Sequence, residues 1–405
     1  MLAELSKEQL KQYLYNKGYY NASVGYDTEE KRNNRKLDVK YRITTGEPYL
    51  IKGIRYEIGD TAMKRLFDQG YSSRMLKPGS LFDLDILDRE RDQLVGFFRN
   101  RGYYNFSKSY IFFEADTVSD LRTCDLKLFL DLSGANRQDS LVILSSYRIN
   151  RFAYHVLQTG QPTVKSDTIS EGRYTFVFPP EYNYRPELLM RLNKMSADEW
   201  YNAGRAENTF NALNRLRQFR FINMNFSPAA DTTELHQLDC RVDLSPLSRQ
   251  STSVDIEGTN TSGNFGIAGN LSYLHRNLFR GAEIFEMKFK GAMERQQAVV
   301  RNESRDFNTR ELGVEGTLTI PQLLGPVGFF SSSGNVVPRS LFTLAYNYQR
   351  RPDYTRTIST MRSGYEWMTS EFERHNWNLM DFNMVKLSQF DPEFINAIYD
   401  LYIRD

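Results

Sequence analysis

Up to Leu244, apolar residues recur at helical spacing in some segments and alternate with polar residues in others. Leu87, Leu94 and Phe98 fall on one face of a predicted helix. The later segment Cys124–Leu130 alternates apolar and polar residues, as a half-buried strand does. This mixture of the two periods predicts an α+β fold for this part of the chain.

A six-residue motif ends two of the predicted helices. It reads Asn-Lys-Gly-Tyr-Tyr-Asn at residues 16–21 and Asn-Arg-Gly-Tyr-Tyr-Asn at residues 100–105. Gly18 and Gly102 stand where the residue after a helix adopts a positive φ. Asp83 and Asp85 are candidate N-caps for the helix before the second copy. We interpret the motif as the mark of a structural repeat.

The same order of elements surrounds each copy. Each copy belongs to a longer unit, and a third, more diverged unit follows. Strands open the second and third units at Tyr49–Ile58 and Tyr147–Tyr154, and the first unit starts after its opening strand. The closing strands share an aspartate that precedes a basic residue by two positions, at Asp38, Asp125 and Asp239. The predicted order within a unit is therefore β-α-α-β-β.

We divide the chain into four parts. They are a partial unit at residues 1–45, a complete unit at 46–135, a third unit at 140–246 and a different region at 249–405. Within the third unit, Gln158–Tyr184 is predicted to be a hairpin-like insertion.

Beyond Arg249 the helical signals stop, and four segments of about ten residues alternate with a period of two, which is typical of transmembrane barrel strands. Their apolar faces hold Phe265, Ile267, Gly269, Leu271 and Tyr273, then Phe285, Met287, Phe289, Gly291 and Met293, then Leu312, Val314, Gly316, Leu318 and Ile320, and then Phe342, Leu344, Tyr346 and Tyr348. A soluble β-sandwich also alternates, but its strands are usually shorter, at about five to six residues. Later strands near 354–367 and 374–382 alternate less clearly.

Composition strengthens the β interpretation and excludes little else. Aromatic residues make up 14% of the chain, with 25 Tyr and 27 Phe, and both types favour strands. The formal net charge of +2 gives no reason to expect nucleic acid as a partner. No window reaches the roughly 18 apolar residues of a membrane helix.

The chain shows no pattern of catalytic or metal-binding residues. His155, His236, His275 and His375 do not have metal-ligand spacing with one another or with a cysteine. Nucleophile, phosphate-loop and dinucleotide motifs are absent from the sequence. No enzyme, metal site or cofactor is therefore predicted.

Two further features are interpreted as structural. Cys124 and Cys240 are predicted to be small buried residues without a disulfide between them. The charged runs Glu29–Glu30 and Asp88–Asp92 are predicted to lie on solvent-exposed faces.

The turn His275–Gly281, preceded by Gly258–Gly263, resembles the first barrel hairpins of the BamA/TamA family of outer-membrane assembly factors. The β-α-α-β-β order and the helix-ending motif resemble the POTRA domains that precede such barrels. The turn motif consists of Asn277, Leu278, Phe279, Arg280 and Gly281. The long third unit, Tyr184–Phe226, is similar to the TamA-like lipoprotein branch. The resemblance covers almost the whole chain.

The resemblance implies a fold class of α+β POTRA repeats followed by an antiparallel transmembrane β-barrel segment. Barrels of the family have roughly sixteen strands, whereas about six or seven are counted here. The inward loop with the family's Arg-Gly-Phe motif and the closing strands are not found, and a helical loop is expected at Asp391–Tyr402. We therefore expect a fragment that is truncated at both ends, with an incomplete barrel.

The resemblance also implies a function, which is the insertion of proteins into the bacterial outer membrane with the POTRA domains in the periplasm. Unfolded outer-membrane proteins and outer-membrane lipid would be the partners, and a periplasm-spanning partner protein is compatible with it. POTRA modules add client strands to a sheet edge. We assign this edge to Tyr110, Ile111, Phe112 and Phe113, whose alternative role is simply to form core. We assign the first barrel strand, or lateral gate, to Thr252, Ser253, Val254, Asp255, Ile256 and Glu257.

Two other functional classes stay open at this point. One is a transporter of the same superfamily that secretes a partner protein or moves lipid. The other is a soluble β-rich binding protein with no role in a membrane.

Overall fold

The computed structural model describes residues 2–30, 37–118, 122–130, 144–157, 166–229, 236–261, 264–295, 307–324, 338–369, 372–390 and 399. The expected helical loop at Asp391–Tyr402 lies outside these ranges except for Tyr399. The chain forms two compact units. The first comprises Met1–Ile149, Asp198–Gly204 and Ala229–Leu238, and the second comprises Asn150–Ala197, Arg205–Pro228 and Asp239–Asp405.

The chain begins with a helix and a hairpin, as predicted. Helix α1 (Leu2–Asn16) is followed by strands β1 (Ser23–Glu30) and β2 (Leu37–Thr44). The two strands pair antiparallel in a sheet of their own. The Tyr41 hydroxyl donates to the Ala3 carbonyl (3.3 Å), so the hairpin holds the first turn of the helix.

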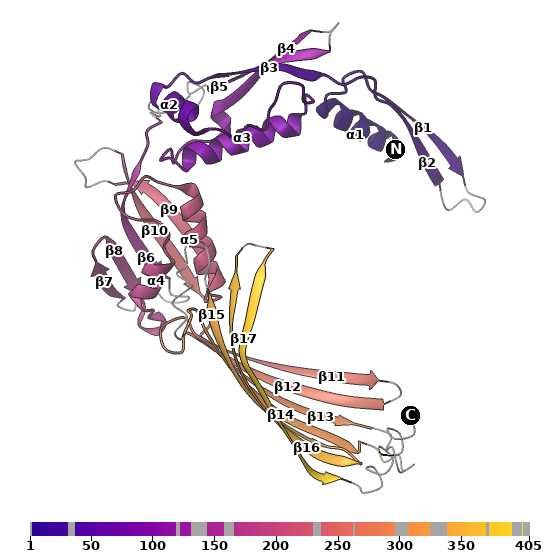
Figure 1. Ribbon diagram of the computed structural model, residues 1–405, viewed down its shortest axis with the longest axis vertical. Coiled ribbons are helices and arrows are strands. Elements are labelled where there is room, and N and C mark those ends of the chain that lie inside the picture. Colours follow the sequence, from indigo (N-terminus) through magenta and orange to yellow (C-terminus); the bar gives the residue numbers. More distant parts are fainter. Residues whose placement is uncertain are drawn as a thin grey trace. The chain divides into compact units, whose positions relative to one another are not determined.

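The second repeat has all of the predicted elements. They are β3 (Leu50–Glu57), α2 (Thr61–Gly70), α3 (Leu84–Arg99), the 3-10 helix η1 (Lys108–Tyr110), β4 (Ile111–Val118) and β5 (Thr123–Leu130) (Figure 1). The sheet has the order β3-β5-β4, with β3 parallel and β4 antiparallel to β5. The order β-α-α-β-β is confirmed.

Helix α3 begins and packs as its sequence predicts. The Asp83 side chain caps the helix by accepting from the Asp85 N–H (2.8 Å). Leu87, Leu94 and Phe98 are buried against the sheet, on the face that the helical spacing gave them.

The two glycines of the repeated motif form equivalent junctions. Gly18 (φ 85°) and Gly102 (φ 102°) both lie in the left-handed region. The Gly18 carbonyl accepts from the Tyr49 N–H and the Gly102 carbonyl accepts from the Tyr147 N–H, each at 2.9 Å. A Cβ would lie 2.7 Å from the Phe82 carbonyl oxygen at Gly18. Only glycine combines the positive φ with so close an approach, so the motif joins the end of one repeat to the residue before the next opening strand.

The charged run at Asp88–Asp92 is not wholly exposed, and that prediction is wrong at Glu90. This residue is fully buried. Its carboxylate accepts from the hydroxyls of Tyr56 (3.0 Å) and Tyr71 (2.9 Å) and from the Met75 N–H (2.8 Å). A spacing of one helical turn from Leu87 and Leu94 places it on the buried face. Burial and then the Glu90 carboxylate raise the pKa of both phenols, which keeps them as hydrogen-bond donors.

The third repeat carries the predicted hairpin. Its elements are β6 (Arg148–Val156), β7 (Asp167–Glu171), β8 (Tyr174–Phe178), the 3-10 helix η3 (Pro180–Tyr182), α4 (Pro186–Leu192), α5 (Ala203–Arg215), β9 (Phe219–Pro228) and β10 (Gln237–Pro246). The sheet has the order β7-β8-β6-β10-β9. β7 and β8 pair antiparallel, and β8 runs parallel to β6. Residues 158–165 of the insertion lie outside the described ranges.

Both cysteines are free and buried, as predicted, with Cys124 in β5 and Cys240 in β10. Burial raises the pKa of the Cys124 thiol to about 11 and that of the Cys240 thiol to about 12. Both are therefore neutral core residues near pH 7. None of the described helices is long and apolar enough to cross a membrane.

The last part of the chain is one antiparallel sheet whose seven strands follow each other in sequence order (Figure 1). They are β11 (Gln250–Thr261), β12 (Asn264–Arg276), β13 (Ile284–Glu294), β14 (Thr309–Ile320), β15 (Arg339–Arg350), β16 (Tyr354–Met368) and β17 (Arg374–Phe390). The predicted number of six or seven strands is confirmed. The first and last strands are longer than the segments 252–257 and 374–382 predicted for them.

The period of two separates this sheet into an apolar face and a polar face. Register places Val254, Leu271, Phe289, Val314 and Tyr346 in one row across five strands. Four of them are predicted apolar-face residues, and Val254 is the register partner of Leu271. All five side chains are exposed or half-buried. The polar face is held by hydrogen bonds instead, such as those that the Glu311 carboxylate accepts from Lys290 (2.9 Å) and Asn347 (2.8 Å).

We expect Glu90→Leu to destabilise the second repeat by about 3 kcal/mol, because one buried and two partly buried donors lose their acceptor at roughly 1–3 kcal/mol each, partly offset by apolar burial. Hydrogen–deuterium exchange of α3 amides in the whole chain measures the loss. Asp92→Leu is the matched control, since its side chain is 62% exposed and its ion pair with Lys108 is worth at most about 1 kcal/mol. Equal exchange in the two variants would contradict a structural role for Glu90.

Candidate functional site

The seven-stranded sheet ends on β11, whose second edge pairs with no strand in the described part of the chain. Arg276 N–H donates to Arg249 O (2.7 Å), immediately before the strand. Main-chain groups alternate between the two edges of an antiparallel strand. The N–H and C=O groups of the even-numbered residues from Gln250 to Asn260, including Val254, are therefore directed to the open edge.

The side chains of β11 divide between the two faces of the sheet. Val254 and Ile256 lie on the apolar face and are 68% and 79% exposed. Ser253, Asp255 and Glu257 lie on the polar face. The predicted gate strand thus has an unpaired edge in the described residues and two exposed apolar side chains beside it.

Another edge that pairs with no strand among the described residues belongs to β4, at the end of the order β3-β5-β4. Leu50 N–H donates to Arg122 O (3.0 Å), so Arg122 and every second residue after it bond to β3. The residues between them bond to β4, where Phe112 is the register partner of Phe129. The β4 residues whose main-chain groups are left for the open edge are Ile111, Phe113, Ala115 and Thr117.

The four residues assigned to this client-binding edge do not all behave as one strand. Tyr110 is the last residue of the 3-10 helix η1 and does not lie in β4. The Ser107 side chain caps this helix. Ile111 is buried, and Tyr110 and Phe113 pack against the core. Phe112 is 42% exposed and stacks on Phe129 with ring centroids 5.8 Å apart. Phe112 is thus the exposed aromatic beside the edge, and the others are anchored in the core.

The turn motif between β12 and β13 is organised by a glutamate that sequence reasoning missed. The buried Glu283 carboxylate accepts from the N–H groups of Phe279 and Gly281, both at 3.0 Å. Asn277 adopts a φ of 57° and its side chain accepts from the Ala282 N–H (3.1 Å). Arg280 also has a positive φ, of 67°. These contacts fix the backbone shape of the turn.

This turn is also one of the contacts between the third repeat and the long sheet. Asn277 Nδ2 donates to the Asn183 carbonyl (2.9 Å), and the Arg185 N–H donates to the Arg280 carbonyl (2.9 Å). Buried Gln218 donates to the Ala282 carbonyl at 3.0 Å. Of the motif's other residues, Phe279 is exposed and Leu278 is partly buried. The motif therefore connects two parts of the second unit, and Glu283 and Gln218 carry no sequence signal that would have revealed this.

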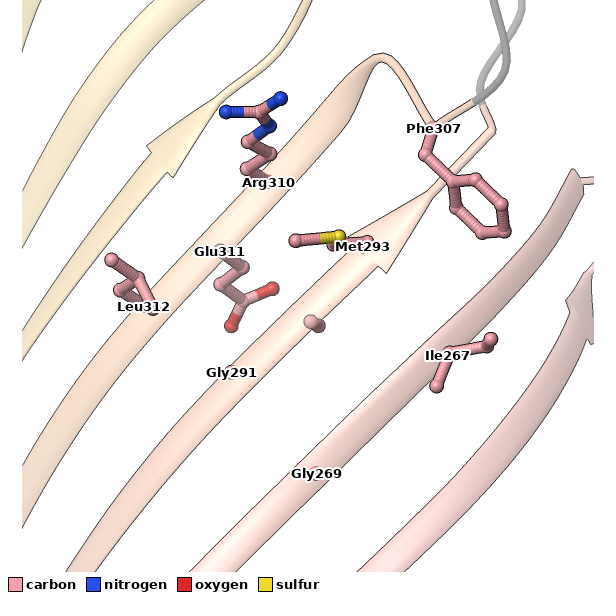
Figure 2. A pocket seen from close by; sticks show the side chains of 9 residues that line it. Ile267, Gly269, Gly291, Met293, Phe307, Arg310, Glu311 and Leu312 are labelled. Atoms are coloured by element: carbon pink, nitrogen blue, oxygen red, sulfur yellow. The ribbon is translucent and has the colours of Figure 1, made fainter.

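The apolar face of the sheet has a hollow over β12, β13 and β14. Figure 2 shows Ile267, Gly269, Gly291, Met293 and Leu312 around it. Its volume is about 520 Å³. The described residues contain no cluster of three or more His, Cys, Asp or Glu side chains that could hold a metal ion.

We expect Gly281→Ala to loosen the turn by roughly 1–3 kcal/mol, because the new Cβ would clash with the Glu283 carboxylate. The measurement is hydrogen exchange, which should become faster at the amide of Phe279 and at the amide of the substituted residue. Gly258→Ala is the matched control, since a Cβ there would meet nothing within 4 Å. Unchanged exchange in the Gly281 variant would show that Glu283 does not organise the turn.

No family model and no curated protein matches the chain. Solved structures do match. The Haemophilus influenzae BamA POTRA3-5 structure is 17% identical, with a TM-score of 0.32, over 60% of this chain and 79% of that one. BamA from Haemophilus ducreyi lacking POTRA domains 1-3 is 14% identical, with a TM-score of 0.40, over 85% of this chain and 64% of that one.

CdiB from Acinetobacter baumannii is 10% identical, with a TM-score of 0.31, over 96% of this chain and 69% of that one. The chain thus spans less than two thirds of the length of the Haemophilus ducreyi BamA chain that it matches.

Proposed function

We propose that this chain is part of an outer-membrane assembly factor of the BamA/TamA type. In this proposal the β-α-α-β-β repeats lie in the periplasm and the seven-stranded sheet lies in the outer membrane. The repeats bind unfolded outer-membrane proteins, and the first strand of the sheet templates their insertion. The observation that carries the proposal is the open edge of β11, next to an apolar face.

The apolar face supports a location in lipid. Contiguous large apolar side chains on this face are exposed by 40% or more. They include Val254, Ile256, Phe265, Ile267, Leu271, Phe289, Leu312, Phe342, Leu344 and Tyr346. A soluble protein rarely leaves so wide an apolar surface uncovered. The alternative of a soluble β-rich binding protein is therefore disfavoured.

Strand addition would use main-chain groups rather than particular side chains. Every second residue of β11 and of β4 directs an N–H and a C=O to its open edge. A client strand placed there would pair with both groups, and its side chains would alternate between the two faces. This chemistry is tolerant of client sequence, which suits a factor that handles many proteins.

Val254→Pro tests the β11 edge. Because the Val254 N–H points to the open edge, proline there removes a donor that the sheet itself does not use. We expect the sheet to persist and client insertion to fall at least about tenfold, because one hydrogen bond of about 1 kcal/mol is lost and the proline ring blocks close pairing of the client strand. The assay is heat-modifiable gel mobility of client barrels assembled by the complete protein.

Two controls separate the possible causes. Val254→Ala keeps the N–H and should retain insertion, whereas Ser253→Pro removes a donor to β12 and should disturb the sheet itself. Normal insertion by Val254→Pro would rule out templating at this edge.

Ala115→Pro tests the β4 edge in the same manner. The Ala115 N–H points to the open edge and its side chain is exposed. We expect a fluorescent client-strand peptide to bind at least about tenfold more weakly, because proline both removes a donor and blocks close pairing. Fluorescence anisotropy gives the affinity, and Ala115→Ser, which keeps the N–H, is the control. Equal binding by the two variants would move the client site away from β4.

A further inference from the structure

Two arginines face each other on the apolar side of the long sheet. Arg310 in β14 and Arg350 in β15 are direct register partners. Arg310 is also the register partner of Met293, which belongs to the apolar face. Both arginines are exposed. A basic pair therefore occupies the same face as the apolar rows.

This pair lacks a neutralising partner. Neither side chain makes a hydrogen bond or an ion pair within the described part of the chain. Like charges directly opposite on neighbouring strands repel each other. An anion placed between the two guanidinium groups would relieve that repulsion, and a phosphate group suits the planar donor fork of arginine.

Arg310 is itself one of the residues that line the hollow. Leu312, two residues from Arg310, is the register partner of Gly291, which in turn pairs with Gly269. Figure 2 shows Arg310 and Leu312 along β14 and the two glycines on the neighbouring strands. The hollow of about 520 Å³ has mainly apolar walls.

The two glycines are not required by the backbone of the sheet. Neither has a positive φ, and an added Cβ would meet nothing closer than 3.9 Å at either position. A larger side chain would therefore fit without strain, and what the glycines provide is empty space. The space lies next to Arg310, and its mainly apolar walls suit part of an acyl chain.

The arginine pair lies at the end of the strands where the headgroup of a bound lipid would be. β11 starts three residues after β10, the last strand of the third repeat, at the end of the sheet where Gln250 lies. Arg350 ends β15 and Arg310 is the second residue of β14, both at the opposite end. If the sheet spans the outer membrane, as proposed above, this end is at the outer surface, where lipid headgroups are.

We infer that Arg310, Arg350 and the glycine hollow form a binding site for a phosphorylated, acylated lipid of the outer leaflet. The phosphate lies between the two arginines and one acyl chain lies over Gly269 and Gly291. This inference rests on the proposed location of the sheet in the outer membrane.

The test uses the whole chain refolded into micelles of a neutral maltoside detergent, with native secondary structure checked by circular dichroism. Native mass spectrometry measures the binding of diphosphoryl lipid A and of its dephosphorylated form. We expect the unmodified chain to prefer the phosphorylated lipid. The double variant Arg310→Gln/Arg350→Gln should bind it at least about tenfold more weakly, because charge-assisted hydrogen bonds are lost.

Three variants identify the cause of any loss. Lys288→Gln removes a positive charge from the polar face of the same sheet and should leave binding unchanged. Arg310→Lys/Arg350→Lys keeps the charge and should recover most of the affinity. Gly291→Leu fills the hollow and should weaken both forms of the lipid.

Several results would overturn the inference. They are equal loss in Lys288→Gln and the double glutamine variant, equal affinity for the two forms of lipid A, or displacement of the lipid by inorganic phosphate alone, which would indicate a simple anion site. The readout is independent of client insertion. Arginine-dependent lipid binding by a chain that inserts no clients would therefore refute the assembly function only, whereas failure of the lipid test leaves that function in place.

Discussion

A β-strand has main-chain donors and acceptors on two edges, and a sheet can satisfy all of them except those of its outermost strands. This constraint underlies the functional proposal for the chain. β4 ends one sheet and β11 ends another, and each directs every second residue to an edge that is unpaired in the described residues. The two sheets differ in fold, but both offer the same main-chain groups to an added strand. An open edge of this kind pairs with an added strand through its geometry and not through a particular side-chain sequence.

A glycine connects each of the first two repeats to the opening strand of the next repeat. Gly18 and Gly102 end their helices with a positive φ and place a carbonyl against the N–H of Tyr49 or Tyr147. The turn after β12 also contains residues with a positive φ, but they are not glycines. Hydrogen bonds to the Glu283 and Asn277 side chains hold the backbone of this turn, which contacts the third repeat. In each case, a local backbone conformation that few residues adopt positions one element against the next.

Most of the fold follows from local patterns in the sequence. The period of two located the strands of the long sheet and identified their apolar face, because alternation in a strand maps directly onto two faces. The Asp83 cap and the buried face of α3 were equally readable. The wrong predictions depend on contacts that the residue pattern does not show, one set distant in the chain and one local. Glu90 resembles its charged neighbours until Tyr56 and Tyr71 are brought to it, and Tyr110 resembles the following strand until Ser107 caps a turn.

The sequence by itself determined the elements, their order and the two faces of the long sheet, since these depend on residue periods and on single glycines and caps. Only the tertiary structure decided which strands lie at an edge, and which of their N–H groups face it, because strand order and register depend on pairing between distant segments. It also brought Arg310 opposite Arg350 and placed Gly269 beside Gly291. The separation of these residues along the chain carries no sign of that proximity, which arises from the register of the folded sheet.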